Sequence, residues 1–440
     1  MTIHNNFALF SAAILASTLF FAACSDDSSS APEEKTSHEE HHGHHMEELS
    51  AGDLTLGDED IQDGFIFLQD TTINGVLTVS TTTPGATVLK NVKVTGNLLI
   101  KRSGRVDFSG SADVVHVGSS NTDVYAFEDE AQVNGHHFMG KNNTFTTKSF
   151  AEYQNVDWTE KSVDLATGIH LAYTVTGDEK GTPVVLIHGL TDGRVSWSQV
   201  APSLAKKGYR VYVPEYRGNG KTDKPIDESS YSVAELASDI AAFVEKLGLK
   251  KVHIVGHSLG AFIAQELSIT NAEIVSSITL IGSGASVDEK NATLDWLVNG
   301  TDDESFDGIY AYDSTQKLPE SFIQAWGYST NPDKDFQAAN LEHLKQVPYY
   351  VWKYLVKNLL KIDNTKRLSS IATDVQIIWG TKDALFDSES QKTLQKGLSG
   401  AKSVVFHEVE GADHNTHWGS AEDVKTVTGY IDEFIKSLKK

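Results

Sequence analysis

The stretch Val252-His253-Ile254-Val255-Gly256-His257-Ser258-Leu259-Gly260 decides the fold. An apolar, largely β-branched run ends in Gly-X-Ser-X-Gly, and a helix-like segment, residues 261–268, follows at once. Strand, sharp turn and helix are the setting in which this pentapeptide presents a serine hydroxyl above a sheet. Gly256 and Gly260 are needed because a Cβ at either position would collide with the crowded turn. We therefore interpret Ser258 as a nucleophile, with an ordinary strand–helix turn as the alternative.

Strand and helix patterns alternate around this stretch from about residue 155 onward. Residues 163–165 and 170–175 predict an antiparallel strand pair. The strands predicted after it are residues 183–189, 209–214, 252–257, 278–282, 375–380 and 403–409. The predicted helices are residues 197–207, 231–247 and 421–438. This order predicts an α/β domain over residues 155–440, with a parallel sheet covered on both faces and function at the carboxyl ends of its strands.

Five motifs occur along this domain in a fixed order. They are His188-Gly189, Glu215-Tyr216-Arg217-Gly218-Asn219-Gly220-Lys221-Thr222-Asp223, the Gly256–Gly260 pentapeptide, Trp379-Gly380-Thr381-Lys382-Asp383, and Gly411-Ala412-Asp413-His414. With them, residues 157–438 resemble the α/β-hydrolase family, in which the triad follows the order Ser, Asp, His. The second motif departs from the family pattern, since Glu215 stands where the family has Asp. The resemblance implies an α/β-hydrolase fold.

The chemistry of a serine nucleophile requires two partners. A serine hydroxyl is a poor nucleophile at neutral pH and needs a base to take its proton. An imidazole with an ordinary pKa of about 6.5 suits that role, and a carboxylate on its other nitrogen fixes the tautomer and stabilises the imidazolium. We predict Ser258 as nucleophile, His414 as base and Asp383 as acid.

The tetrahedral oxyanion of such a reaction needs preorganised N–H donors, worth about 3–4 kcal/mol each. We predict the backbone N–H of Leu259 as one donor and that of Leu190, in the loop after Gly189, as the other. This mechanism requires no metal and no organic cofactor.

Other residues compete for these roles or flank them. Asp413 and Asp387 are alternatives to Asp383, and His417 is an alternative base. We expect His257 to pack beneath the nucleophile turn and His188 to hold the adjacent loop by a hydrogen bond. The family's haloalkane dehalogenases and epoxide hydrolases use aspartate as nucleophile, so a serine argues against both activities.

An insertion of about 284–370 separates the strand at 278–282 from the one at 375–380. The resemblance implies that it forms a helical cap over the active site, and such lids set specificity and exclude water. We expect most of its aromatic side chains to hold the cap together and the others to line the substrate site. These aromatics are Trp296, Phe306, Tyr310, Tyr312, Phe322, Trp326, Tyr328, Tyr349, Tyr350, Trp352 and Tyr354.

Residues 51–150 are rich in Val, Ile, Thr, Asn and Gly and show no helical periodicity. Four apolar–polar–Gly units, Ile73-Asn74-Gly75, Val94-Thr95-Gly96, Phe108-Ser109-Gly110 and Val133-Asn134-Gly135, lie 21, 14 and 25 residues apart. Short strands with Gly corners favour a small all-β domain of the β-helix type, with a β-sandwich as the alternative. Such a domain could bind a cell-surface polysaccharide or serve as a spacer.

The N-terminus carries an export signal in this interpretation. Residues 7–24 are uncharged and mostly apolar, and they end in Ala22-Ala23-Cys24 before a Ser/Asp-rich segment. This resembles a bacterial lipoprotein signal, which implies a signal peptide over residues 1–23 and a lipid anchor on Cys24 in the cell envelope. A plain secretory signal with an incidental cysteine is the alternative.

Residues 24–50 predict a disordered acidic, His-rich tether, because so few apolar groups cannot offset the entropy of ordering. Its five histidines could bind a transition metal, although a solvated spacer is the simpler interpretation. Residues 25–63 carry thirteen acidic residues and one lysine, about half of the net charge of −23. This charge argues against nucleic acid as a partner, since phosphate binding needs basic patches.

Together these features predict a membrane-anchored serine hydrolase whose partner is a small ester or other acyl substrate. Carboxylic ester hydrolysis is the first hypothesis. A peptidase, an amidase or a C–C bond hydrolase on the same triad is the rival enzyme, and a non-catalytic cell-surface binding protein is the rival of another class.

Overall fold

The structure is a computed structural model, and it describes residues 52–62, 64–126, 131–141, 143–146, 159–300, 306–312, 318–327, 331 and 333–438. The predicted signal peptide, Cys24 and the tether lie outside the described residues. None of the helices in the described part of the chain is long and apolar enough to cross a lipid bilayer.

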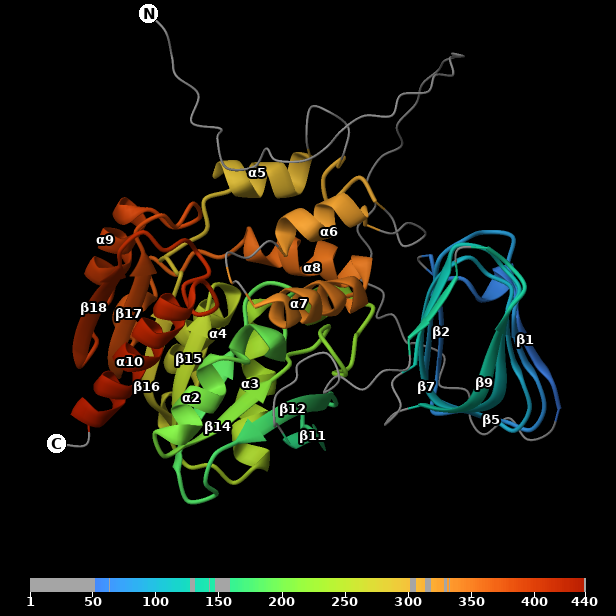
Figure 1. The fold of residues 1–440 in the computed structure, drawn as a ribbon, viewed down its shortest axis with the longest axis horizontal. Coiled ribbons are helices and arrows are strands. Elements are labelled where there is room, and N and C mark those ends of the chain that lie inside the picture. The colour runs from blue at the N-terminus through green and yellow to red at the C-terminus, as the bar shows by residue number, and fades with distance from the viewer. Residues whose placement is uncertain are drawn as a thin grey trace, which may run out of the picture. The chain divides into compact units, whose positions relative to one another are not determined.

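Ten short strands between residues 54 and 146 form an all-β unit (Figure 1). They are β1 (Leu54–Leu56), β2 (Phe65–Gln69), β3 (Thr72–Ile73), β4 (Leu77–Val79), β5 (Ala86–Val94), β6 (Leu98–Ile100), β7 (Gly104–Val117), β8 (Thr122–Tyr125), β9 (Ala131–Phe138) and β10 (Thr144–Thr146). All pairings between these named strands are parallel. Antiparallel sheets of a β-sandwich would not give this pattern, so the β-helix prediction is confirmed.

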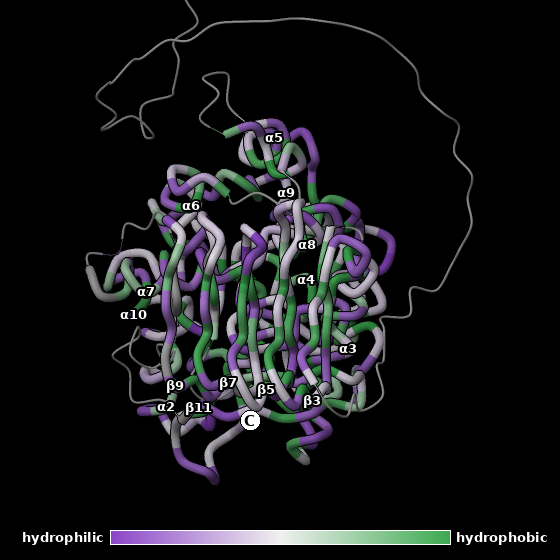
Figure 2. The backbone as a smooth tube through the Cα atoms, turned by 90° about the vertical axis from the view of Figure 1, so that its right-hand side faces the viewer, coloured by the Kyte–Doolittle hydropathy of each residue, from purple (hydrophilic) through white to green (hydrophobic). Residues whose placement is uncertain are grey.

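Successive coils of the β-helix stack their apolar side chains inward. Leu77 pairs with Leu98 and Leu98 with Val115, and all three side chains are fully buried. The next residues along these strands, Thr78 and Leu99, are only partly buried, because successive strand side chains point to opposite faces. Figure 2 colours these strands by hydropathy, with hydrophobic (green) and hydrophilic (purple) stretches along them.

One of the four predicted corner units is misplaced. Ile73 pairs with Val94, which puts the 73–75 and 94–96 units in register, whereas Gly135 pairs with Val114. Gly110 lies elsewhere, in the β5–β7 pairing, where an added Cβ would lie 2.6 Å from the Val92 carbonyl carbon. Successive coils are offset by 21, 18 and 21 residues in these pairings, so the coils repeat more regularly than the four glycines do.

The second unit is built on an eight-stranded sheet in the order β11-β12-β14-β13-β15-β16-β17-β18. Its strands are β11 (Thr159–Asp164), β12 (His170–Thr176), β13 (Thr182–Ile187), β14 (Tyr209–Pro214), β15 (Val252–His257), β16 (Val275–Ile281), β17 (Asp374–Gly380) and β18 (Ser403–Val409). Strands β11 and β12 pair antiparallel, as predicted, and β13 to β18 pair parallel. This is the predicted α/β-hydrolase sheet.

Helices cover both faces of the sheet. Helices α3 (Val233–Lys246) and α4 (Leu259–Thr270) contribute to one apolar cluster, together with α9 (Ser388–Gly397). Helices α2 (Val200–Lys206) and α10 (Ala421–Ser437) contribute to the other. Helix α4 is buried over most of its length, as expected for a helix packed between the sheet and other helices.

The insertion between β16 and β17 forms the predicted helical cap. Its helices are α5 (Ala292–Asn299), α6 (Glu320–Trp326), α7 (Lys334–Gln346) and α8 (Tyr349–Leu359), which lie together in Figure 1. The Tyr350 hydroxyl donates to the Lys224 carbonyl at 2.9 Å, so α8 is held against the loop that follows β14. Phe306 stacks on Phe322 with ring centroids 4.1 Å apart, which places both in the interior of the cap.

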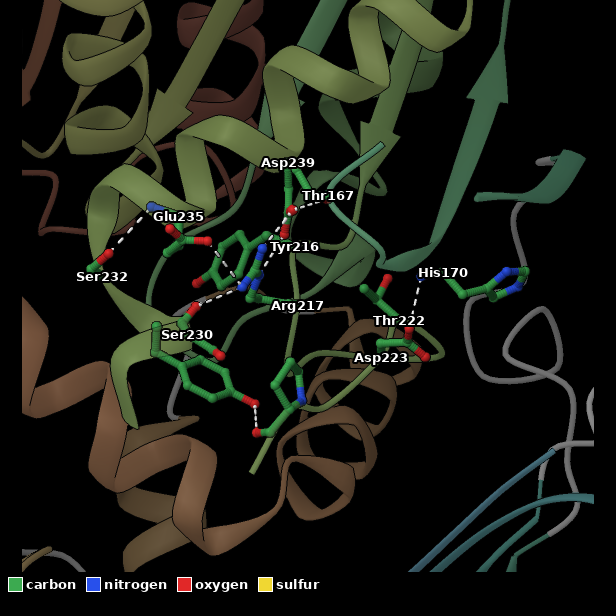
Figure 3. Close-up of polar contacts among 12 residues, drawn as sticks. Thr167, His170, Tyr216, Arg217, Thr222, Asp223, Ser230, Ser232, Glu235 and Asp239 are labelled. Atoms are coloured by element: carbon green, nitrogen blue, oxygen red, sulfur yellow. Dashed lines mark hydrogen bonds and ion pairs between the residues drawn. The ribbon is translucent and has the colours of Figure 1, made fainter. Parts of the chain in front are cut away.

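The motif loop after β14 is fixed to α3 by a buried ion pair (Figure 3). Arg217 binds Asp239 through Nε and Nη2 at 2.6 and 2.7 Å, and Thr167 donates to the same carboxylate at 2.6 Å. The Asp239 side chain is fully buried and that of Arg217 is 5 % exposed. Bidentate pairing satisfies both groups out of water, so this arginine serves the architecture of the loop.

Candidate active site

Ser258 occupies a strained turn between β15 and α4. Its backbone angles are φ 50° and ψ −117°, in a region that non-glycine residues rarely adopt. An added Cβ on Gly256 would lie 2.6 Å from the Ala261 nitrogen, and one on Gly260 would lie 2.6 Å from the His188 carbonyl oxygen. The turn is as crowded as the sequence predicts, and such strain persists only where surrounding contacts enforce it.

His414 and Asp383 meet next to this turn. Asp383 follows β17, and His414 lies in the loop after β18. The His414 Nδ1 donates to Asp383 Oδ2 at 2.9 Å. Asp383 also accepts the backbone N–H groups of Leu385 and Phe386 at 2.8 and 3.0 Å, and its side chain is fully buried. The carboxylate is therefore held rigidly on the imidazole.

Backbone contacts bring the His414 ring toward Ser258. The Ser258 N–H donates to the carbonyl of Ile281, at the end of β16, at 2.9 Å. The next residue, Gly282, lies so close to His414 that an added Cβ would be 3.0 Å from Nδ1. In addition, His257 Nε2 donates to the His414 carbonyl at 3.1 Å. The loops after β15, β17 and β18 thus bring Ser258, Asp383 and His414 close together.

The electrostatics of the pair suit a base and its carboxylate. Burial lowers the pKa of His414, but the Asp383 charge and hydrogen bond outweigh it and leave that pKa above its ordinary value. Burial raises the pKa of Asp383, yet the charge and hydrogen bond of His414 and the two backbone N–H groups bring it below its ordinary value. Asp383 is therefore ionised at neutral pH.

The flanking histidines lie where the sequence suggests. His257 is buried beneath the turn, and burial lowers its pKa. His188 Nδ1 lies 3.0 Å from the Gly189 carbonyl oxygen, and its ring stacks on Tyr216 with centroids 4.0 Å apart. Both side chains hold the site together.

The alternative residues have other surroundings. Asp387 caps α9 by accepting the Ser390 N–H at 2.8 Å, and Asp413 accepts the Asn415 N–H at 2.8 Å. His417 is fully buried between Trp197 and His257, with centroid distances of 4.3 and 4.2 Å. Burial lowers its pKa well below the ordinary value. The structure brings Asp383, and neither other aspartate, onto Nδ1 of His414.

The loop of residues 188–193, which we call the 188–193 loop, carries Leu190. Leu190 is buried, and the next residue, Thr191, has φ 56°, an unusual value for a β-branched residue. The Tyr216 hydroxyl donates to the Gly189 carbonyl at 2.6 Å. Leu259 opens α4, so its N–H has no acceptor within the helix.

Two polar residues beside the site were not identified from the sequence. The Asp192 carboxylate lies 3.6 Å from His257 Nδ1, and His343 of α7 lies against Gly193. Tertiary packing reveals both residues. The one sequence signal is the His188-Gly189 motif, since Asp192 follows it by three residues. Across the described residues, His, Cys, Asp and Glu form no group of three or more that is placed to hold a metal ion.

Comparison with known proteins gives a consistent family. A family model for the alpha/beta hydrolase fold matches residues 182–421. Epoxide hydrolase 1 of Caenorhabditis elegans is 25% identical over 318 residues, which are 69% of this chain and 77% of that protein. The 2-hydroxy-6-oxononadienedioate/2-hydroxy-6-oxononatrienedioate hydrolase 1 of Pseudomonas putida is 28% identical over 291 residues, 62% of this chain and 93% of that protein.

Solved structures agree with the fold. An esterase from Exiguobacterium antarcticum superposes with a TM-score of 0.52 at 20% identity, covering 64% of this chain and 99% of that one. The enol-lactonase from Burkholderia xenovorans superposes with a TM-score of 0.51 at 17% identity, covering 63% of this chain and all of that one.

Proposed function

The chain belongs to the α/β-hydrolase family, and we propose that it is a serine hydrolase that cleaves carboxylic esters through an acyl-enzyme on Ser258. The observation that carries the proposal is the juxtaposition of the strained Ser258 turn with the buried His414–Asp383 pair. A nucleophile, a base and a carboxylate that fixes the tautomer of the base are the three groups that acyl transfer needs.

In the proposed reaction, Ser258 Oγ attacks the ester carbonyl carbon while His414 takes the hydroxyl proton. The backbone N–H groups of Leu190 and Leu259 donate to the oxyanion. The tetrahedral intermediate collapses, the C–O bond to the leaving group breaks, and His414 returns its proton to the departing alkoxide. Water, deprotonated by His414, then attacks the acyl-enzyme and releases the carboxylic acid and free Ser258.

A serine at the nucleophile position separates this chain from the epoxide hydrolase activity that one relative's name states. Members of the family with that activity use aspartate there, whereas the strained turn here presents Ser258. C–C bond cleavage is the second candidate. The Pseudomonas putida relative named as a 2-hydroxy-6-oxononadienedioate hydrolase is 28% identical, and the match covers 93% of that protein. Amide hydrolysis and a non-catalytic binding role are the remaining alternatives.

A panel of p-nitrophenyl esters of increasing acyl length, with the matching p-nitroanilides and a 2-hydroxy-6-oxodienoate, tests the substrate class. We expect turnover of the esters, with kcat/KM rising and then falling as the acyl chain exceeds what the cap accommodates. Ester turnover no faster than that of the anilides would favour an amidase. Cleavage of the dienoate alone would replace the ester proposal with C–C hydrolysis.

The pH profile should report the base. His414 acts only when neutral, so kcat/KM is expected to fall as pH drops through its pKa and to level off above it. Because Asp383 holds this pKa above its ordinary value of about 6.5, the Asp383→Asn variant should shift the acid limb to lower pH. Stopped assays with a p-nitrophenyl ester across the pH range measure this. If the acid limb of the kcat/KM profile lies at the same pH in the variant as in the wild type, protonation of His414 does not cause that limb.

We further propose that the protein is a lipoprotein anchored in the bacterial cell envelope through Cys24. The support is the apolar segment ending in Ala22-Ala23-Cys24, which precedes an acidic tether. Stable anchoring requires two or more acyl chains, since one gives only marginal binding. Cys24→Ser should move the protein from the membrane fraction to the soluble fraction, with unchanged ester turnover. Fractionation unaffected by the substitution would contradict the anchor.

A further inference from the structure

The 188–193 loop needs external support. It carries Leu190, the second oxyanion donor of the proposed mechanism, next to Thr191 with φ 56°. A β-branched residue at positive φ is strained, and that conformation persists only where neighbouring contacts determine it. The Tyr216 hydroxyl holds one end of the loop, at the Gly189 carbonyl. The other end is Gly193.

The cap reaches Gly193 directly through His343 of α7. A Cβ added to Gly193 would lie 2.5 Å from Nε2 and 2.6 Å from Nδ1 of His343, so the ring rests on the glycine backbone with no side chain between them. The His343 side chain is buried, at 1% exposure for the residue. Gly193 has extended backbone angles, so its lack of a side chain serves this contact and not a turn.

Helix α7 is anchored on the segment that follows the loop. Phe336 and Ala339 form a small apolar cluster with Val195 and Trp418. Ala339 lies one helical turn before His343, so the same face of α7 carries the apolar contact and the histidine. Val195 belongs to the short 3₁₀ helix Arg194–Trp197, immediately after Gly193. A movement of α7 would therefore move the end of the loop.

The surroundings of His343 favour the neutral form of its ring. Burial lowers the pKa of His343, while the Glu215 carboxylate and a hydrogen bond to the backbone of Asp192 counter part of that effect. The Glu215 charge is itself engaged by Arg194, whose Nε lies 3.2 Å from Oε1. Glu215, which stands where the family motif has Asp, thus holds its carboxylate beside Arg194, the residue that follows the loop.

We infer that His343 is a positioning residue that lets the cap hold the 188–193 loop in its strained form and so keeps the Leu190 N–H aimed at the oxyanion. This inference rests on the proposed serine hydrolase mechanism. It assigns the cap a role in transition-state stabilisation besides substrate binding. An N–H donor that is not held in position before the reaction stabilises the oxyanion less, because ordering the donor then adds to the activation free energy.

His343→Ala is the direct test. Loss of a whole oxyanion donor costs about 10²–10³-fold in kcat, so loosening one should lower kcat by about 10- to 100-fold, with KM changed less than threefold. The rate at which a fluorophosphonate modifies Ser258 should fall in parallel, because the phosphoryl oxygen uses the same donors. His343→Gln, which keeps an N–H donor, should recover part of the kcat. Gly193→Ala should reproduce the kcat loss by pushing the ring away.

Asn340→Ala is the matched control. Asn340 is also buried on α7, but its amide donates to the Gly327 carbonyl within the cap at 3.3 Å. It should leave kcat within threefold of wild type even where thermal unfolding shows similar destabilisation. A His343→Ala enzyme with wild-type kcat, or one no more impaired than Asn340→Ala, would overturn the inference. Wild-type protein that the fluorophosphonate fails to label would instead refute the proposed function.

Discussion

Replacing Ser258 by alanine is expected to lower kcat for a p-nitrophenyl ester about 10⁶-fold, the scale of loss seen when other serine hydrolases lose their nucleophile. Without Oγ no acyl-enzyme can form, and only the oxyanion donors and substrate binding remain to accelerate attack by water. The strained turn does not depend on the Ser258 side chain, since its backbone makes the hydrogen bonds to Ile281, Ala261 and Phe262. The variant should therefore fold. Steady-state assays and fluorophosphonate labelling measure the loss.

Ser268→Ala provides the control for this variant. Ser268 is a buried serine on α4, the helix that begins after Ser258, and its hydroxyl makes no hydrogen bond to any of the described residues. Its removal should leave both turnover and labelling near wild type. Turnover in Ser258→Ala above about 1% of wild type would be far more than the oxyanion donors alone supply, and the assignment of the nucleophile would be wrong.

Asp383→Asn is expected to lower kcat by about 10⁴-fold, the effect of placing the wrong hydrogen-bonding group on a catalytic histidine. An amide can donate to Nδ1, which stabilises the tautomer whose Nε2 carries the proton and cannot accept one from Ser258. The amide oxygen can still accept the Leu385 and Phe386 N–H groups, so the fold should survive. Circular dichroism and steady-state kinetics on the same preparation separate the two effects.

Asp387→Asn and Asp413→Asn are the matched controls, because both aspartates lie near the same strand ends. Each accepts a backbone N–H in its own loop or helix cap, whereas the carboxylate bonded to the His414 ring is that of Asp383. We expect activity within about tenfold of wild type for both, since only local structure changes. A larger loss in Asp413→Asn than in Asp383→Asn would transfer the role of the acid to Asp413.

The hydrolase fold was predictable because its signals are local and their order is constrained. Each strand of the sheet is a short apolar run, and the motif residues follow these runs directly: Ser258 after β15, Asp383 after β17 and His414 after β18. Parallel strands place their carboxyl ends at one edge of the sheet, so residues at those ends meet without any knowledge of long-range contacts. The pairing of His414 with Asp383 follows from this geometry.

The β-helix was only partly predictable, because the glycines of its sequence pattern do not occupy equivalent positions in successive coils. The units at 73–75 and 94–96 are in register, whereas Gly135 pairs with Val114 and not with Gly110. Gly110 is required for a different reason: the β5 backbone at Val92 lies so close that a side chain would not fit. A pattern built on glycine alone therefore mixes different positions of the coil and reports irregular spacing. Only the strand register distinguishes the two uses of glycine.

His343 could not be predicted because nothing in its own segment points to the active site. It is one polar residue on the buried face of a cap helix, and its partner Gly193 lies 150 residues earlier in the chain. The contact depends on how α7 packs over Val195 and Trp418, which is a tertiary property. A buried histidine on a cap helix is the one local signal, and it does not identify the partner.

Trapping the acyl-enzyme tests the central claim most directly. Wild-type protein mixed with a slowly deacylating p-nitrophenyl ester, quenched in acid and analysed by intact and peptide mass spectrometry, should gain one acyl group on the peptide that contains Ser258. The Ser258→Ala variant should gain none. Rapid ester turnover with no adduct in wild type, or with the acyl group on another residue, would contradict the account.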